Sequence, residues 1–301
     1  MSTNQQTLLV TGASGHLGSI AIDWLLANYE GPIIATTRDP EKLSALSALS
    51  ARGVIVRKAD FDQPETLSEA FAGAQRLLLI STDAIAVPGQ RLKQQTDALS
   101  AAVQAGVKHI VYTSIPNSEP GSACLIAPDH YATEELIKNS GLSYTILRNN
   151  LYSENLIPTL QQAVASGILG TATGEGATAY VTRHDCAWSA AAALASTTTD
   201  NQIVDVTGPE AISGSELAQI ASEISGKSIQ FVPLETAKLV EIFESIGLPS
   251  GLAQAYASFD TASARGEYAQ TSATVQQLTG KSPTTLKQFL TDNKSAFTGA
   301  E

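Results

Sequence analysis

Short apolar runs alternate with amphipathic stretches through the first half of the chain. The runs are rich in Leu, Ile and Val and cover residues 8–10, 33–37, 54–57, 77–80, 109–113 and 144–147. Between them, apolar residues recur every three or four positions, as Leu17, Ala21, Trp24 and Leu25 do, which is the spacing of a helix with one buried face. Six strands alternating with helices predict an α/β fold with a doubly wound parallel sheet over residues 1–150.

The rhythm loosens after residue 150. We expect helices at 155–166, 186–195 and 284–293, a glycine-rich loop at 167–176, and strands at 202–206 and 229–232. Ser213 and Glu216 have the spacing of a capping box, which predicts a helix through Ile224. Residues 151–301 are therefore expected to form mostly a smaller C-terminal α/β substrate-binding lobe, with segments at about 180–207 returning to the first sheet.

Composition disfavours several classes of function. The 29 acidic and 18 basic residues give a formal net charge of −11, which disfavours direct binding to nucleic acid or anionic lipid. No apolar run approaches the roughly 18 residues of a membrane span, so we expect a soluble cytoplasmic protein, either a monomer or a homodimer. Cys124, Cys186 and four scattered histidines show no metal-ligand spacing, so no metal is expected and both cysteines are interpreted as buried apolar residues.

The stretch LLVTGASGHLG (residues 8–18) places Gly12, Gly15 and Gly18 directly behind the first predicted strand. Between a strand and a helix, such glycines permit a tight turn, let backbone approach a pyrophosphate, and let helix and strand pack closely. The N-terminus of the helix then offers unpaired N–H groups to the phosphate. The alternative is a plain turn, but a position at the head of a βαβ series favours a dinucleotide site.

The end of the second predicted strand bears on which dinucleotide binds. NAD-binding sheets usually have an acidic side chain there for the adenosine ribose, whereas this strand runs into Arg38, with Lys42 further on. A guanidinium suits a 2′-phosphate, so NADP(H) is favoured. Two alternatives stay open: Asp39 could reach a ribose hydroxyl after a one-residue shift, and Arg38 and Lys42 could mark a solvated helix start.

Several segments resemble the NmrA-like branch of the short-chain dehydrogenase/reductase superfamily. They are TGASGHLG, TTRDPEKL, KADFDQPETLSEAFAG, LLLIS, AGVKHIVYTS, TEELIKNSGLSYTILRNNLYSEN and TGPEAISGSELAQIASEISGK. Within that branch the chain is most similar to bacterial NADPH:quinone oxidoreductases of the quinone oxidoreductase 2 type and to triphenylmethane reductases. The resemblance implies a Rossmann fold that binds NADP(H) at the carboxyl ends of its strands.

The resemblance, together with the loop and strand-end positions above, assigns a set of cofactor contacts. These are Gly12, Ala13, Ser14, Gly15, His16, Leu17, Gly18, Arg38, Lys42, Asp60, Phe61, Ser81, Thr82, Asp83, Thr113, Ser114, Asn149 and Tyr152. Taken singly, many of these residues could equally be turn or cap residues. Their convergence on one sheet edge favours the cofactor interpretation.

The chemistry expected from the sequence is hydride transfer with little acid–base catalysis. Tyr131 stands where short-chain dehydrogenases carry a catalytic tyrosine, but Glu135 occupies the position of the activating lysine, and a carboxylate there would raise the tyrosine pKa. Ordinary alcohol dehydrogenation is therefore disfavoured. Both residues are interpreted as lying on a helix surface.

The acceptor side is assigned to LRNNLYSEN and YVTRHD. By resemblance, Asn155 is the catalytic residue, its amide holding a developing oxyanion, and Tyr152 and Tyr180 are substrate contacts. Asn155 could instead cap the following helix, and Arg183 with Asp185 could form a structural ion pair. His184 is expected on the surface.

Two functions follow from the resemblance. One is an NADPH-dependent oxidoreductase that reduces a quinone or a similar conjugated aromatic acceptor, with a dye or azo compound as another possible substrate. The other is a non-catalytic NmrA-like regulator that senses NADP(H) and acts through protein partners. The LYSEN segment favours the enzyme.

Overall fold

The structure, a computed structural model, describes residues 5–41 and 49–299. Two units share the chain. The first is drawn from residues 1–114, 129–148 and 186–204, and the second from residues 115–128, 149–185 and 205–301. The chain therefore passes between the units several times.

A sheet with the strand order β3-β2-β1-β4-β5-β6-β9 organises the first unit. Its strands are β1 (Leu8–Val10), β2 (Ile33–Thr37), β3 (Ile55–Lys58), β4 (Arg76–Leu79), β5 (His109–Ser114), β6 (Ser143–Asn149) and β9 (Gln202–Val206). The pairs from β3 through to β6 are parallel. The order reverses between β1 and β4, which is the switch point where doubly wound sheets bind ligands. The predicted doubly wound α/β fold is confirmed.

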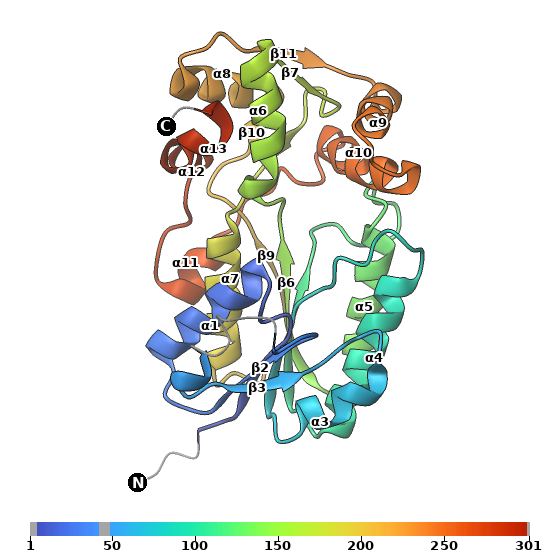
Figure 1. Cartoon of the computed structure of the whole chain (residues 1–301), viewed down its shortest axis with the longest axis vertical. Helices are drawn as coiled ribbons and strands as arrows, with labels where there is room; N and C mark the ends of the chain where they lie inside the picture. Colours follow the sequence, from blue (N-terminus) through green and yellow to red (C-terminus); the bar gives the residue numbers. More distant parts are fainter. Residues whose placement is uncertain (1–4, 42–48, 300–301) are drawn as a thin grey trace. The chain divides into compact units, whose positions relative to one another are not determined.

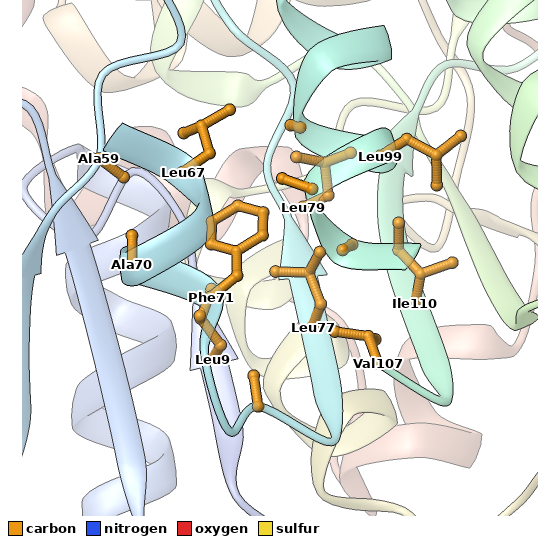
Figure 2. Packing of buried hydrophobic residues seen from close by; sticks show 14 of the residues in the cluster. Leu9, Ala59, Leu67, Ala70, Phe71, Leu77, Leu79, Leu99, Val107 and Ile110 are labelled. Atoms are coloured by element: carbon orange, nitrogen blue, oxygen red, sulfur yellow. The ribbon is translucent and has the colours of Figure 1, made fainter. Parts of the chain in front are cut away.

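Helices cover both faces of this sheet, with α1 and α7 on one side and α3, α4 and α5 on the other (Figure 1). Their bounds are α1 (His16–Asn28), η1 (Pro64–Thr66, a 3₁₀ turn), α3 (Leu67–Phe71), α4 (Gln90–Gln104), α5 (Ala127–Lys138) and α7 (Arg183–Ala195). Phe71 of α3 and Leu99 of α4 pack with Leu77, Leu79 and Ile110 of the sheet, all buried (Figure 2). Burying apolar side chains such as these is the main favourable contribution to folding.

The second unit contains two small sheets. Strand β7 (Ile168–Thr171) pairs in parallel with β11 (Gln230–Pro233), and β8 (Ala177–Thr178) pairs antiparallel with β10 (Ile212–Ser213). Its helices are η2 (Ser153–Leu156, a 3₁₀ turn), α6 (Ile157–Ser166), α8 (Gly214–Ser225), α9 (Thr236–Ser245), α10 (Ser250–Ala264), α11 (Thr274–Thr279), α12 (Leu286–Asp292) and α13 (Lys294–Thr298). Residues of α6, α8, α12 and α13 form one apolar core.

Some elements differ from the sequence predictions. The expected loop at 167–176 contains strand β7, because the glycines around it obscured a run of only four residues. The helix expected from residue 155 is a 3₁₀ turn before it becomes α6, which has a proline in its first turn. The helix expected at 186–195 begins at Arg183. The capping box of Ser213 and Glu216 is confirmed.

Candidate functional site

A cavity of about 260 Å³ opens in the first unit, next to the carboxyl ends of β1, β2, β3 and β4. Nine predicted cofactor residues line it: Gly12, Ser14, Gly15, Arg38, Asp60, Phe61, Ser81, Thr82 and Asp83. The cavity therefore brings together side chains from four segments that are far apart in the sequence, at the edge of the sheet where ligands of this fold bind.

Two glycines of the loop between β1 and α1 are required by the fold itself. Gly12 has φ +59°, a left-handed conformation that favours glycine. A Cβ on Gly18 would lie 2.3 Å from the Gly12 carbonyl oxygen, so α1 can approach the loop this closely only without a side chain. Both positions serve the tight turn and the close packing that the sequence predicted.

Gly15 differs from its two neighbours. Its backbone is extended, at φ −81° and ψ 166°, and it is the N-cap of α1 with no side-chain hydrogen bond to the helix. A Cβ there would lie 3.3 Å from the Gly12 carbonyl oxygen, which is tight but not prohibitive, and the residue lines the cavity. Gly15 itself therefore places no side chain between the N-terminus of α1 and the cavity, which suits a phosphate.

Arg38 is exposed and lines the cavity, whereas Asp39 is not among the lining residues. The positive charge of Arg38 helps to hold the pKa of the nearby Asp62 carboxyl below its usual value, although hydrogen bonds from Gln94 and Gln90 contribute more. Lys42 lies outside the described residues. Among the described residues that line the cavity, Arg38 offers a guanidinium suited to a 2′-phosphate.

The hydroxyl groups of Thr113 and Ser114, at the end of β5, form hydrogen bonds with other residues of the protein. Thr113 Oγ1 accepts a hydrogen bond from the Ser81 amide at 2.9 Å, which ties the ends of β4 and β5 together. Ser114 Oγ donates to Glu134 Oε1 at 2.6 Å, and the fully buried Glu134 also pairs with Arg148 at 2.7 Å. Neither Thr113 nor Ser114 lines the cavity, and nor do Ala13, His16, Leu17 or Gly18.

The predicted acceptor-side residues belong to the second unit. Asn149 is buried and its Nδ2 donates to the Tyr152 hydroxyl at 3.2 Å. In the described part of the chain, Asn149 Oδ1 has no hydrogen-bond partner. An unsatisfied buried acceptor is costly, so this atom is well suited to receive a hydrogen bond from a ligand.

Asn155 lies in the 3₁₀ turn η2, and the N-cap position of α6 is held by Leu156. The helix-cap interpretation of Asn155 is therefore wrong. Its Oδ1 accepts a hydrogen bond from Arg183 Nη2 at 2.6 Å, and the same guanidinium stands 5.3 Å from the centre of the Tyr152 ring. With the oxygen facing Arg183, the amide nitrogen of Asn155 is the group left to donate.

The structure also shows the contacts of Arg183, Asp185 and Tyr180, which lie in the YVTRHD segment. Arg183 and Asp185 bind different partners, since Asp185 Oδ2 accepts hydrogen bonds from Thr182 Oγ1 and from the Thr284 amide. Tyr180 packs against the core of α6 and α8, and burial raises the pKa of its hydroxyl.

Tyr131 is half-buried on α5, and Glu135 pairs with Lys138 at 2.9 Å. His184 is exposed, as expected. Cys124 and Cys186 are buried free thiols, also as expected.

Several residues that line the cavity were not predicted from the sequence. Thr36 and Thr37 end β2, and Ala59 and Ile80 flank predicted positions, so adjacency would have identified them. Asp62 could have been found as the second acid of the ADFD stretch. Gln94 sits on α4, one of many polar residues there, and only the tertiary fold places it at the cavity.

Within residues 5–41 and 49–299, no group of three or more His, Cys, Asp or Glu side chains is placed to hold a metal ion. Among those same residues, no helix is long and apolar enough to cross a bilayer.

The fold and the cavity together define a dinucleotide-binding Rossmann protein of the doubly wound class. The family model described as the NmrA-like family matches residues 4–290. The chain belongs to that family.

Three relatives are similar over nearly their whole length. Quinone oxidoreductase 2 of Escherichia coli is 34% identical over 93% of this chain and 96% of its own. The structure of this NADPH-dependent enzyme complexed with NADPH matches with a TM-score of 0.88, at 34% identity, over 95% of this chain and 99% of that chain.

The structure of triphenylmethane reductase from Citrobacter sp. complexed with NADP(H) matches with a TM-score of 0.86, at 35% identity, over 95% of this chain and 99% of that chain. An NAD(P)H azoreductase of Xenophilus azovorans is 28% identical over 97% of this chain and the whole of its own.

Proposed function

We propose that this protein is an NADPH-dependent oxidoreductase that passes a hydride to a quinone or a similar conjugated aromatic acceptor. The observation that carries the proposal is the cavity at the switch point, where the glycine loop, Arg38 and the ends of β3 and β4 meet. The named activities of the relatives support it, because quinone, triphenylmethane and azo compounds are all electron-poor conjugated acceptors.

The residues at the cavity suit NADP(H). Gly15 leaves the N-terminus of α1 open for a pyrophosphate, and Arg38 offers a forked donor for a 2′-phosphate. Thr82 and Gln94 line the cavity. Thr82 Oγ1 and Gln94 Oε1 are buried, and neither has a hydrogen-bond partner within the part of the chain that the structure describes. Such atoms favour a ligand that brings its own polar groups.

The acceptor class follows from what the site offers chemically. When bound, a reduced nicotinamide supplies the hydride, and the balanced reaction converts a quinone, NADPH and a proton into a hydroquinone and NADP⁺. Tyr131 has Glu135 in place of the activating lysine four positions later, and Glu135 pairs with Lys138, so these residues do not form the Tyr–Lys pair that protonates an alcohol oxygen. An acceptor that delocalises the incoming charge and takes its protons from water needs mainly positioning.

The second unit supplies the residues that we assign to the acceptor. Tyr152 presents an aromatic ring, and Asn155 donates through its amide nitrogen to a developing oxyanion. Arg183 holds the amide oxygen and thereby sets which end of Asn155 faces outward. Tyr180 is the further substrate contact that we propose.

The proposal is tested by following NADPH oxidation with simple quinones, a triphenylmethane dye and an azo dye. We expect turnover with at least one of these acceptors and a lower Kd for NADPH than for NADH. Tight NADPH binding without turnover of any acceptor would instead favour the NADP(H)-sensing regulator.

Asn155 can be tested with a matched pair of variants. Asn155→Asp keeps an oxygen facing Arg183 but removes the donor, whereas Asn155→Ala removes both. If donation to the oxyanion matters, both variants should lower kcat with the best acceptor by roughly 10²-fold, with NADPH affinity unchanged. Full activity in Asn155→Asp would show that the donor is not used.

A further inference from the structure

The hydrogen bonds of Gln94 suit this residue, which lines the cavity, to recognise the purine base of a bound dinucleotide. Gln94 is a residue of α4 with only 7% of its surface exposed, and it lines the cavity together with Phe61 and Asp62. Its Nε2 donates to Asp62 Oδ1 at 2.8 Å. Its Oε1 is buried and has no hydrogen-bond partner among the described residues.

Asp62 determines which way the Gln94 amide is turned. An ionised carboxylate only accepts hydrogen bonds, so the nitrogen of Gln94 must face Asp62 and the oxygen must face away. Gln90 Nε2 also donates to Asp62 Oδ1, at 3.1 Å, and these two hydrogen bonds keep the pKa of Asp62 below its usual value. Asp62 therefore stays ionised at neutral pH, and its hydrogen bond favours the orientation in which Gln94 Nε2 faces the carboxylate.

The groups beside Gln94 define the chemistry of its partner. Phe61 is half-buried and packs against the core under the sheet while it lines the cavity, which provides an apolar wall for a flat ring. Arg38, on the same lining, suits the phosphate of the adjoining ribose. What Oε1 lacks is a donor, and adenine offers one in its exocyclic amine, whereas guanine and hypoxanthine present a carbonyl oxygen at the same position.

We propose that Gln94, oriented by Asp62, selects adenine over 6-oxopurines in the dinucleotide. The inference rests on the proposed NADP(H) site. A 6-oxopurine would set its oxygen against Gln94 Oε1. Turning the amide over would relieve that contact only by placing Oε1 against the Asp62 carboxylate, so both orientations disfavour a carbonyl oxygen at the 6-position of the purine.

The test compares NADPH with its hypoxanthine analogue, which differs only in the purine. Calorimetric titration of the wild-type protein should give a Kd for NADPH about tenfold or more below that of the analogue, as expected when one base-edge hydrogen bond is satisfied or lost. Asp62→Asn should bring the two Kd values within about threefold of each other, because the new amide can donate to Gln94 Oε1 and let the side chain turn over. Gln94→Leu should also remove the preference.

Gln90→Leu is the matched control. Gln90 binds the same Asp62 oxygen but is not among the residues that line the cavity, so this variant should keep the wild-type ratio of Kd values. Equal affinity of the wild-type protein for both dinucleotides would overturn the role of Gln94 while leaving NADPH binding intact. Failure of both dinucleotides to bind would overturn the cofactor site itself.

Discussion

At the scale of single residues, the three glycines behind β1 differ in backbone conformation and in the space that a side chain would have. Gly12 needs a left-handed backbone, and Gly18 needs the absence of a Cβ. Gly15 has φ and ψ that suit any residue, and a Cβ there would make one tight contact, at 3.3 Å from the Gly12 carbonyl oxygen. The requirements at Gly12 and Gly18 concern folding. At Gly15, a larger residue would instead take up space in the cavity, which that residue lines.

This difference predicts opposite outcomes for two similar variants. Gly15→Val should fold normally, since a β-branched residue tolerates an extended backbone, but its methyl groups should occupy the phosphate position and abolish NADPH binding. Gly18→Val should lose folded protein, because its Cβ would overlap the Gly12 carbonyl. Circular dichroism and calorimetry on both variants check this, and a folded Gly15→Val protein with intact NADPH affinity would show that the loop does not hold the phosphates.

A second prediction concerns cofactor binding by the Arg38 guanidinium. If this guanidinium binds the 2′-phosphate, Arg38→Ala should weaken NADPH binding by about 1.5–3 kcal/mol, or roughly 10- to 150-fold in Kd. Affinity for NADH, which has no such phosphate, should change little. Arg52→Ala is the control, because Arg52 pairs with Asp23 on the surface. An equal loss for both cofactors would argue against phosphate recognition.

The predicted residues that line the cavity share one property, which is that they closely follow a strand or form the glycine loop. Their position is local information, since a strand that ends in a parallel sheet delivers its next residues to the ligand edge. Gln94 and the partners of Asn155 are different. Gln94 reaches the cavity from a helix, and Arg183 meets Asn155 across 28 positions of sequence, so no local pattern announces either contact.

At the scale of elements, one buried arginine joins β4 to the end of α7. Arg76 is 2% exposed and donates to the carbonyl oxygens of Leu194, Thr198 and Ala193 at 2.8, 3.0 and 3.2 Å. Burial lowers its pKa to about 10, which still leaves it charged at neutral pH. A positive charge suits the carbonyl end of a helix.

Replacing this arginine should therefore destabilise the first unit. Arg76→Leu leaves buried carbonyl groups without donors, which should lower the free energy of unfolding by about 3 kcal/mol. Arg52→Leu, at a half-exposed surface pair, should cost less than about 1 kcal/mol. Urea titrations of both variants give the comparison, and similar midpoints would mean that the three hydrogen bonds contribute little.

Elements were predictable from the sequence where their pattern was long or strongly apolar. The strands of the parallel sheet each contain a short run of apolar residues, and their ends fell within two residues of the prediction. Strand β7 was missed because its four residues include Gly170 and follow Gly167, and its pairing with β11 depends on residues about 60 positions away. Short strands of this kind are specified by their partner.

At the scale of the whole molecule, stability should depend on pH through a buried histidine. His109 is 1% exposed, and its ring nitrogens lie 2.9 Å from Ser143 Oγ and 3.0 Å from Thr145 Oγ1. Burial, with a smaller contribution from Arg76, lowers its pKa from 6.5 to about 4. Below pH 6.5 the unfolded chain therefore takes up a proton that the folded protein resists.

The sign of the effect follows from linkage. Stability is fully present above the unfolded pKa and is lost as the pH falls from 6.5 towards about 4. With solvent screening, we expect a loss of about 2 kcal/mol from this group. His109→Gln, which keeps an amide beside both hydroxyls, should show a loss smaller by that amount when unfolding is measured at neutral and acidic pH. Parallel curves for the two proteins would contradict this assignment.

The central claim is that this member of the NmrA-like family transfers a hydride from NADPH to a conjugated acceptor. The most direct test is a single-turnover reaction with a simple quinone, comparing NADPH with NADPH deuterated at the transferring position of the nicotinamide. We predict that hydroquinone forms in proportion to the NADPH consumed and that the deuterated cofactor reacts more slowly. Saturable NADPH binding with no consumption in the presence of quinone, dye or azo acceptors would contradict it.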